Sequence, residues 1–183
     1  NLGNGKFKIS ALPVEAQIAP IYGMLPYDLD GDGFEDLLMV GNDYGMELMQ
    51  GRADALQGLA LKNEKGKGFS SMRMSASGFH VPGDARALGR IMVGNRELVM
   101  ATQNRDSVRL FSLPAVFGGK VTKISSEEIY AVITLQDGTS FRKEFRHGST
   151  FVTQDSRSIV FHPQFREIAL YDRNGKQTRN ITR

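Results

Sequence analysis

The amino-acid sequence predicts an all-β protein, and three of its features lead to that prediction. The chain is rich in turn residues, with 20 glycines and 6 prolines among 183 residues. Its apolar residues fall into short runs bounded by turn residues, which is typical of strands. One sequence pattern also occurs twice within residues 1–115, as expected of small sheets that pack against their neighbours.

Two pairs of landmarks define the repeat. A glycine-rich turn leads to Phe7 and again to Phe69, 62 residues later, and an apolar run begins at Leu37 and again at Leu98, 61 residues later. Because both landmarks give nearly the same period, residues 1–115 are expected to form two repeated units. In the second unit, residues 86–93 and 97–102 flank a Gly-Asn turn and are predicted to form a hairpin. The sequence leaves residues 53–61 open between helical turns and an ordered loop.

A boundary is expected at residues 114–119, where Pro and Gly-Gly interrupt any periodicity. Residues 120–183 then form a separate region with about six short predicted strands. Two of its turns, at Asp137-Gly138 and at Asn174-Gly175, are strong hairpin signals. This pattern predicts a small β-sandwich or barrel after the two repeats.

Charge and composition exclude several classes of function. Residues 1–60 carry nine acidic side chains against three basic ones, whereas the bases of the remaining chain are scattered. A nucleic-acid surface needs clustered bases interleaved with aromatic residues, so none is expected. There is no cysteine, no long apolar run that could span a membrane and no nucleophile elbow, and the three histidines are isolated. We therefore expect neither a catalytic site nor a membrane span.

One motif indicates specific chemistry: the acidic loop of residues 28–36, with the sequence DLDGDGFED. The aspartates at loop positions 1, 3, 5 and 9 would repel one another unless a cation bound between them. Ca²⁺ takes six to eight oxygen ligands in flexible geometry, which suits this spacing. The expected ligands are the carboxylates of Asp28, Asp30, Asp32 and Asp36 and the backbone carbonyl of Phe34, whose ring would join the core. Glu35 is expected to stay outside the set of ligands.

Two alternatives to this calcium site were weighed. An EF-hand would need a glutamate at loop position 12, where this chain has Met39, and its flanks would be helices rather than strand-like runs. An acidic surface loop built only from Asx turns would need no metal at all. In the second repeat a shift of 61 residues places Gly89, Ile91, Val93 and Glu97 at the ligand positions, so no metal is expected there.

The acidic loop, followed by Leu-Leu-Met-Val-Gly-Asn and preceded by the Asn-x-Gly-x-Gly-x-Phe turn, resembles the FG-GAP or VCBS-type repeat of integrin-like β-propellers. The resemblance covers about residues 1–113 and implies four-stranded antiparallel blades, with Ca²⁺ between the first two strands of a blade. Residues 120–183, with the segment from Phe145 to Arg157 and the Tyr-Asp-Arg-Asn-Gly turn, resemble the ASPIC/UnbV domain. In many secreted bacterial proteins this domain follows FG-GAP blades.

Together these features predict a non-catalytic calcium-binding interaction or adhesion module. It is expected to act outside the bacterial cytoplasm, where Ca²⁺ is abundant, on a protein or glycan partner. Since a closed propeller typically needs four to eight blades, the two repeats form an incomplete ring, and the chain is expected to be the C-terminal part of a larger protein. Its open blade edges predict self-association, unless the C-terminal region covers them. The alternative is the accessory end of a secreted polysaccharide-processing enzyme.

Overall fold

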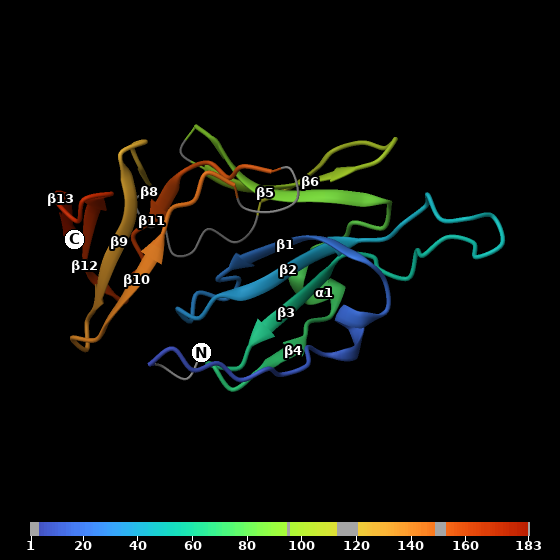
Figure 1. The fold of residues 1–183 in the computed structure, drawn as a ribbon, viewed down its shortest axis with the longest axis horizontal. Coiled ribbons are helices and arrows are strands. Elements are labelled where there is room, and N and C mark those ends of the chain that lie inside the picture. Colours follow the sequence, from blue (N-terminus) through green and yellow to red (C-terminus); the bar gives the residue numbers. More distant parts are fainter. Residues whose placement is uncertain (1–3, 95, 113–120, 149–152, 183) are drawn as a thin grey trace.

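The computed structural model describes residues 4–94, 96–112, 121–148 and 153–182. The protein is all-β, as predicted, and is built from antiparallel sheets, none of which closes into a barrel (Figure 1). Its described helical segments are the short turns η1 (Val14–Gln17) and α1 (Met74–Ser77). The expected boundary at residues 114–119 lies outside the described residues, and so do residues 149–152, which are part of the segment that resembles the ASPIC/UnbV domain.

The first repeat forms a four-stranded antiparallel meander. Its strands follow one another in sequence and in space: β1 (Ile21–Tyr27), β2 (Asp36–Gly41), β3 (Leu59–Asn63) and β4 (Phe69–Ser71). The segment of residues 53–61, left open by the sequence, holds no helix and ends in β3. The connection from β1 to β2 is the acidic loop, and Tyr27 pairs with Asp36 at its base. The loop therefore lies between two strands.

The second repeat forms a three-stranded sheet of β5 (Ala85–Val93), β6 (Arg96–Gln103) and β7 (Arg109–Phe111). The hairpin expected around Gly94 is present, with Val93 paired to Arg96. β5 and β6 thus correspond to β1 and β2 of the first repeat, but a tight turn stands in place of the acidic loop.

One hydrophobic core joins the two sheets. Leu25, Leu38 and Val40 of the first sheet pack with Leu88 and Val99 of the second, and each is at most 1% exposed. The sheets approach so closely at Gly23 that a Cβ atom there would lie 2.8 Å from Val40 and 2.9 Å from the Cβ of Leu88. The two repeats therefore pack against each other through a shared core.

The C-terminal region contains a four-stranded sheet in the order β10-β9-β12-β13. Its strands are β9 (Glu128–Leu135), β10 (Ser140–Glu144), β12 (Phe165–Asp172) and β13 (Gln177–Thr182). A two-stranded sheet of β8 (Val121–Lys123) and β11 (Ser158–Val160) lies beside it, and the two share a separate hydrophobic core around Ile133, Ile168 and Leu170. Both hairpins predicted from Asp-Gly and Asn-Gly are present.

Candidate metal centre

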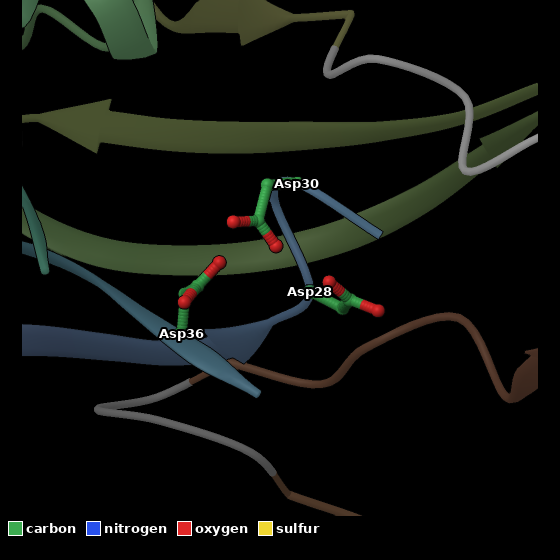
Figure 2. A group of neighbouring side chains, drawn as sticks. All are labelled: Asp28, Asp30 and Asp36. Atoms are coloured by element: carbon green, nitrogen blue, oxygen red, sulfur yellow. The ribbon is translucent and has the colours of Figure 1, made fainter. Parts of the chain in front are cut away.

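The acidic loop brings three carboxylates together at the edge of the first sheet. Asp28, Asp30 and Asp36 each offer an oxygen, and these oxygens all lie within 4.8 Å of one another. Figure 2 shows the three side chains around a common space, with Asp28 and Asp30 contributed by the loop and Asp36 by the first residue of β2. This group of oxygens can hold a metal ion.

Asp36 is the most deeply placed of the three, with only 1% of its surface exposed. One of its oxygens accepts a hydrogen bond from the backbone of Leu29 at 2.9 Å, and the other accepts one from the backbone of Asn63 at 2.7 Å. Asp36 therefore ties the start of the loop to the end of β3. Each of its oxygens keeps a further lone pair.

Asp28 and Asp30 shape the loop by bonding to its backbone. The two oxygens of Asp28 accept hydrogen bonds from the N–H groups of Gly31 and Gly33, at 2.7 and 3.0 Å. Gly31 and Gly33 both have positive φ angles, of 76° and 87°, which favour glycine at these positions. Asp30 accepts from the backbone of Asp32 and pairs with the ammonium group of Lys62 on β3.

The electrostatics of the three carboxylates differ. Burial raises the pKa of Asp28 and of Asp36, and hydrogen bonds from the backbone offset only part of that effect. The neighbouring charges of Asp30 and Asp28 raise the pKa of Asp36 further. In contrast, the hydrogen bond from Lys62 lowers the pKa of Asp30. Among the described residues, Lys62 forms an ion pair with Asp30 and the imidazole of His162 lies 3.7 Å from Asp28, whereas Asp36 has no ion-pair partner.

Asp32, the fourth predicted carboxylate ligand, lies outside this group of three carboxylates. The side chain of Asp32 accepts a hydrogen bond from the backbone of Phe34, and its carbonyl oxygen accepts one from Gln164. The ring of Phe34 is 40% exposed, so the expectation that it joins the core is wrong. Glu35 points elsewhere and forms an ion pair with Lys143 at 2.6 Å.

The flanking structure differs from that of an EF-hand. Met39, at loop position 12, is only 1% exposed and lies within β2, where it pairs with Met24 of β1. In the second repeat the position equivalent to Asp36 is Glu97, whose carboxylate accepts a hydrogen bond from the hydroxyl of Ser158 at 3.2 Å. The tight turn of that hairpin has no counterpart of Asp28 and Asp30.

The C-terminal region contacts the acidic loop directly, which the sequence analysis missed. A ring nitrogen of the buried His162 lies 3.0 Å from the carbonyl oxygen of Gly31 and 3.7 Å from a carboxylate oxygen of Asp28. The side chain of Gln164 donates to the carbonyl of Asp32 at 3.0 Å. A Cβ atom at Gly33 would lie 2.3 Å from the side-chain oxygen of Gln164, so a side chain at this position would displace Gln164 as well as strain the positive φ of 87°. These partners are more than 130 residues apart in sequence, and no local pattern reports such contacts.

No protein-family model matches this sequence, and no curated protein matches it. Among the described residues, no helix is both long enough and apolar enough to cross a membrane.

Proposed function

We propose that this chain is a non-catalytic calcium-binding interaction module. In this proposal the first sheet is a blade of the FG-GAP type, Ca²⁺ occupies the acidic loop, and residues 120–183 form a domain of the ASPIC/UnbV type that packs against it. The module acts outside the cytoplasm, on a protein or glycan partner.

The observation that carries the proposal is the group of three carboxylates at Asp28, Asp30 and Asp36. Two ligand oxygens on one Ca²⁺ ion can lie up to about 5 Å apart, because each Ca–O distance is about 2.3–2.6 Å. The 4.8 Å limit on the oxygens of the cluster fits this range. The choice of Ca²⁺ over Mg²⁺ rests on the spacing of oxygen ligands along the loop, since Ca²⁺ accepts six to eight oxygens in flexible geometry.

The electrostatics also support a bound cation. Burial and mutual repulsion raise the pKa of Asp28 and Asp36, so the ionised cluster is unfavourable without a counter-charge. A divalent ion supplies that charge and stabilises the folded state, because the unfolded chain does not assemble the site. In the proposed complex, Asp32 and the carbonyl of Phe34 complete the set of ligands after a local adjustment of the loop.

Thermal unfolding tests this function. The melting temperature should be measured in millimolar Ca²⁺ and in chelator, because an ion that binds only the folded state adds about 2.7 kcal/mol at a hundredfold excess over Kd. Asp30→Ala should remove the Ca²⁺-dependent rise in melting temperature. Glu35→Ala is the matched control, because it also removes one acidic side chain from the loop. It should retain the Ca²⁺-dependent rise, because Glu35 pairs with Lys143 instead.

Equal melting temperatures in Ca²⁺ and chelator would overturn the proposed site, provided that elemental analysis shows the chelated protein to be free of metal. If Asp30→Ala and Glu35→Ala reduce the Ca²⁺-dependent rise in melting temperature equally, the assigned ligands are wrong.

A further inference from the structure

A turn of the C-terminal region bonds to the backbone of the acidic loop. The turn comprises residues 162–164, between β11 and β12, and is called the contact turn below. Nε2 of His162 lies 3.0 Å from the carbonyl oxygen of Gly31, and the side-chain amide of Gln164 donates to the carbonyl of Asp32 at 3.0 Å. Two consecutive carbonyl groups of the loop are therefore bonded to one distant segment of the chain.

The contact turn is fixed to its own sheet. The carbonyl of Gln164 accepts a hydrogen bond at 2.9 Å from the backbone of Gln136, which directly follows β9. The carbonyl of His162 accepts one at 2.9 Å from the backbone of Phe165, the first residue of β12. The ring of His162 is buried and lies 5.5 Å from the ring of Phe165. The C-terminal sheet thus holds the donors in place, and the donors hold the loop.

The hydrogen bonds of His162 determine which of its nitrogens donates. Nδ1 accepts the backbone N–H of Gln164 at 3.2 Å, so in the neutral ring the proton lies on Nε2. Nε2 therefore donates to the carbonyl of Gly31. The contact turn supplies one donor to each of two successive loop carbonyls.

The carbonyl groups of the loop differ in whether they are bonded. Those of Gly31 and Asp32 accept from the contact turn, and that of Glu35 accepts from the side chain of Asn63 at 2.9 Å. Of the hydrogen bonds between described residues, none ends on the carbonyl of Phe34, the predicted backbone ligand. The loop is therefore held in a shape that leaves this carbonyl available to a metal ion.

Elsewhere the two regions are joined at few points. A cavity of about 700 Å³ lies between β1 and the C-terminal sheet, and Phe34 lines it. On β5 the backbone of Arg90 donates to Asp155, away from the loop. Lys143 pairs with Glu35, but the side chain of Glu35 is 53% exposed, and such ion pairs contribute little. The contact turn is thus the main connection between the loop and the C-terminal region.

We propose that His162 and Gln164 are positioning residues of the calcium site, through which the C-terminal region sets its affinity. The contact turn favours the loop shape that binds Ca²⁺. By thermodynamic linkage, Ca²⁺ strengthens the contact of the turn with the loop by the same factor by which that contact strengthens Ca²⁺ binding. This inference rests on the proposed calcium site and adds its regulation by a distant part of the chain.

Titration calorimetry of the metal-free whole chain with Ca²⁺ tests the inference. Gln164→Met keeps a side chain of similar length and removes its donor, so Ca²⁺ should bind about threefold to tenfold more weakly. The matched control is Gln177→Met, which removes another exposed glutamine of the C-terminal region. Gln177 pairs with Tyr171, at the opposite end of β12 from the contact turn, so this variant should bind Ca²⁺ as the wild type does.

Substitutions of His162 test the second donor. His162→Leu should weaken Ca²⁺ binding, whereas His162→Gln places an amide N–H near the position of Nε2 and should restore much of the affinity. A role in stability alone would lower the melting temperature in chelator and leave the dissociation constant for Ca²⁺ unchanged. Because the side chain of Gln164 is exposed, Gln164→Met tests the inference even if His162→Leu does not fold.

Hydrogen exchange measures the reciprocal effect. Ca²⁺ should slow exchange of the backbone N–H groups of Gln136 and Phe165, which bond to the contact turn. The slowing should be smaller in Gln164→Met, because one of the two bonds between the turn and the loop is lost.

Three results would each overturn the inference: Gln164→Met binds Ca²⁺ as tightly as the wild type, Gln177→Met weakens binding as much as Gln164→Met does, or Ca²⁺ leaves the exchange of both N–H groups unchanged. Each of these results, together with saturable Ca²⁺ binding by the wild type, would leave the calcium site itself intact. No Ca²⁺ binding by the wild type would overturn the calcium site and this inference together.

Discussion

Two buried carboxylates, Asp36 in the first sheet and Glu128 in the C-terminal sheet, have nearly equal exposure, 1% and 2%. Each accepts backbone hydrogen bonds, but their charges are compensated in different ways. Glu128 pairs with the guanidinium of Arg179 at 2.6 Å, whereas within the described residues Asp36 has no ion pair and lies beside Asp28 and Asp30. The protein thus supplies its own cation in one region and leaves a group of carboxylates together in the other.

The pKa values follow this difference. Burial alone would raise the pKa of Glu128, but hydrogen bonds from Arg179, Ser125 and Thr178 outweigh it and lower the pKa to about 2. Burial raises the pKa of Asp36, and its hydrogen bonds do not reverse the effect. A carboxylate that serves only the fold is stabilised in its charged form, as Glu128 is. The pKa of Asp36 shifts in the opposite direction, so its charged form lacks the stabilisation that Arg179 gives to Glu128.

Amide substitutions should give the largest contrast between the two residues. In chelator, Glu128→Gln should destabilise the protein by about 1.5–3 kcal/mol, because the amide replaces one of the two buried oxygens that accept hydrogen bonds from Ser125, Thr178 and the half-exposed Arg179. Asp36→Asn keeps one acceptor oxygen, loses the acceptor for one of the two backbone N–H groups and removes repulsion, so these effects partly cancel and the free energy of unfolding should change by less than about 1.5 kcal/mol. Urea unfolding of both variants measures the difference. Equal losses would show that Asp36 is as much a structural anion as Glu128.

Asp36→Ala should destabilise the protein more than Asp36→Asn does. Asp36→Ala leaves the N–H groups of Leu29 and Asn63 without an acceptor, which should destabilise the protein by about 2 kcal/mol. The matched control is Glu97→Ala at the equivalent position of the second repeat. Within the described residues, Glu97 accepts the longer side-chain hydrogen bond from Ser158 at 3.2 Å, so its loss should destabilise the protein by less than about 1 kcal/mol. A cost at Glu97 equal to that at Asp36 would contradict the assigned role of Asp36.

Glu128 and Asp36 should change the free energy of unfolding in opposite directions as the pH falls. Because the pKa of Glu128 is lower in the folded state, its contribution is complete above its ordinary value of 4.5 and is lost as the pH falls toward about 2. Glu128→Gln should flatten this acid limb of the stability curve. The raised pKa of Asp36 acts in the opposite direction and favours folding as the pH falls toward its ordinary value of 3.8. An unchanged acid limb in Glu128→Gln would contradict this assignment.

The smallest expected effect concerns Lys62, which pairs with Asp30 at the acidic cluster. Its ammonium group competes with a bound metal ion for that carboxylate. Lys62→Met should therefore strengthen Ca²⁺ binding by about threefold to tenfold, as measured by titration calorimetry. Arg179→Met, which removes the cation beside Glu128, should leave Ca²⁺ affinity unchanged. Weaker Ca²⁺ binding in Lys62→Met would mean that Lys62 supports the site.

The local parts of this structure could be predicted from the sequence, and the long-range contacts could not. Aspartate spacing located the acidic loop, and Gly-Asn, Asp-Gly and Asn-Gly turns located the hairpins of β5–β6, β9–β10 and β12–β13. Each of these signals lies within a few consecutive residues, so the sequence alone reveals it. The bond from Asn63 to Asp36 and the approach of Gln164 to the loop join distant segments, so no spacing reveals them.

The exposed ring of Phe34 shows the same limit. An aromatic residue after a loop of aspartates is expected in a core, because burial of its ring is favourable. The position of the C-terminal sheet decides the outcome, since Phe34 lines the cavity between that sheet and β1. Packing between distant segments therefore determined which apolar side chains of the loop were buried.

Titration calorimetry of the metal-free chain with Ca²⁺ tests the central claim most directly. The proposed calcium site predicts about one Ca²⁺ ion per chain, because the carboxylate cluster lies in the first repeat and the second repeat has none of the equivalent loop aspartates. Asp30→Ala should remove the binding signal, and Glu35→Ala should preserve it. No saturable binding to the metal-free chain, or two ions per chain with Asp30→Ala binding as the wild type does, would contradict the assignment of the acidic loop.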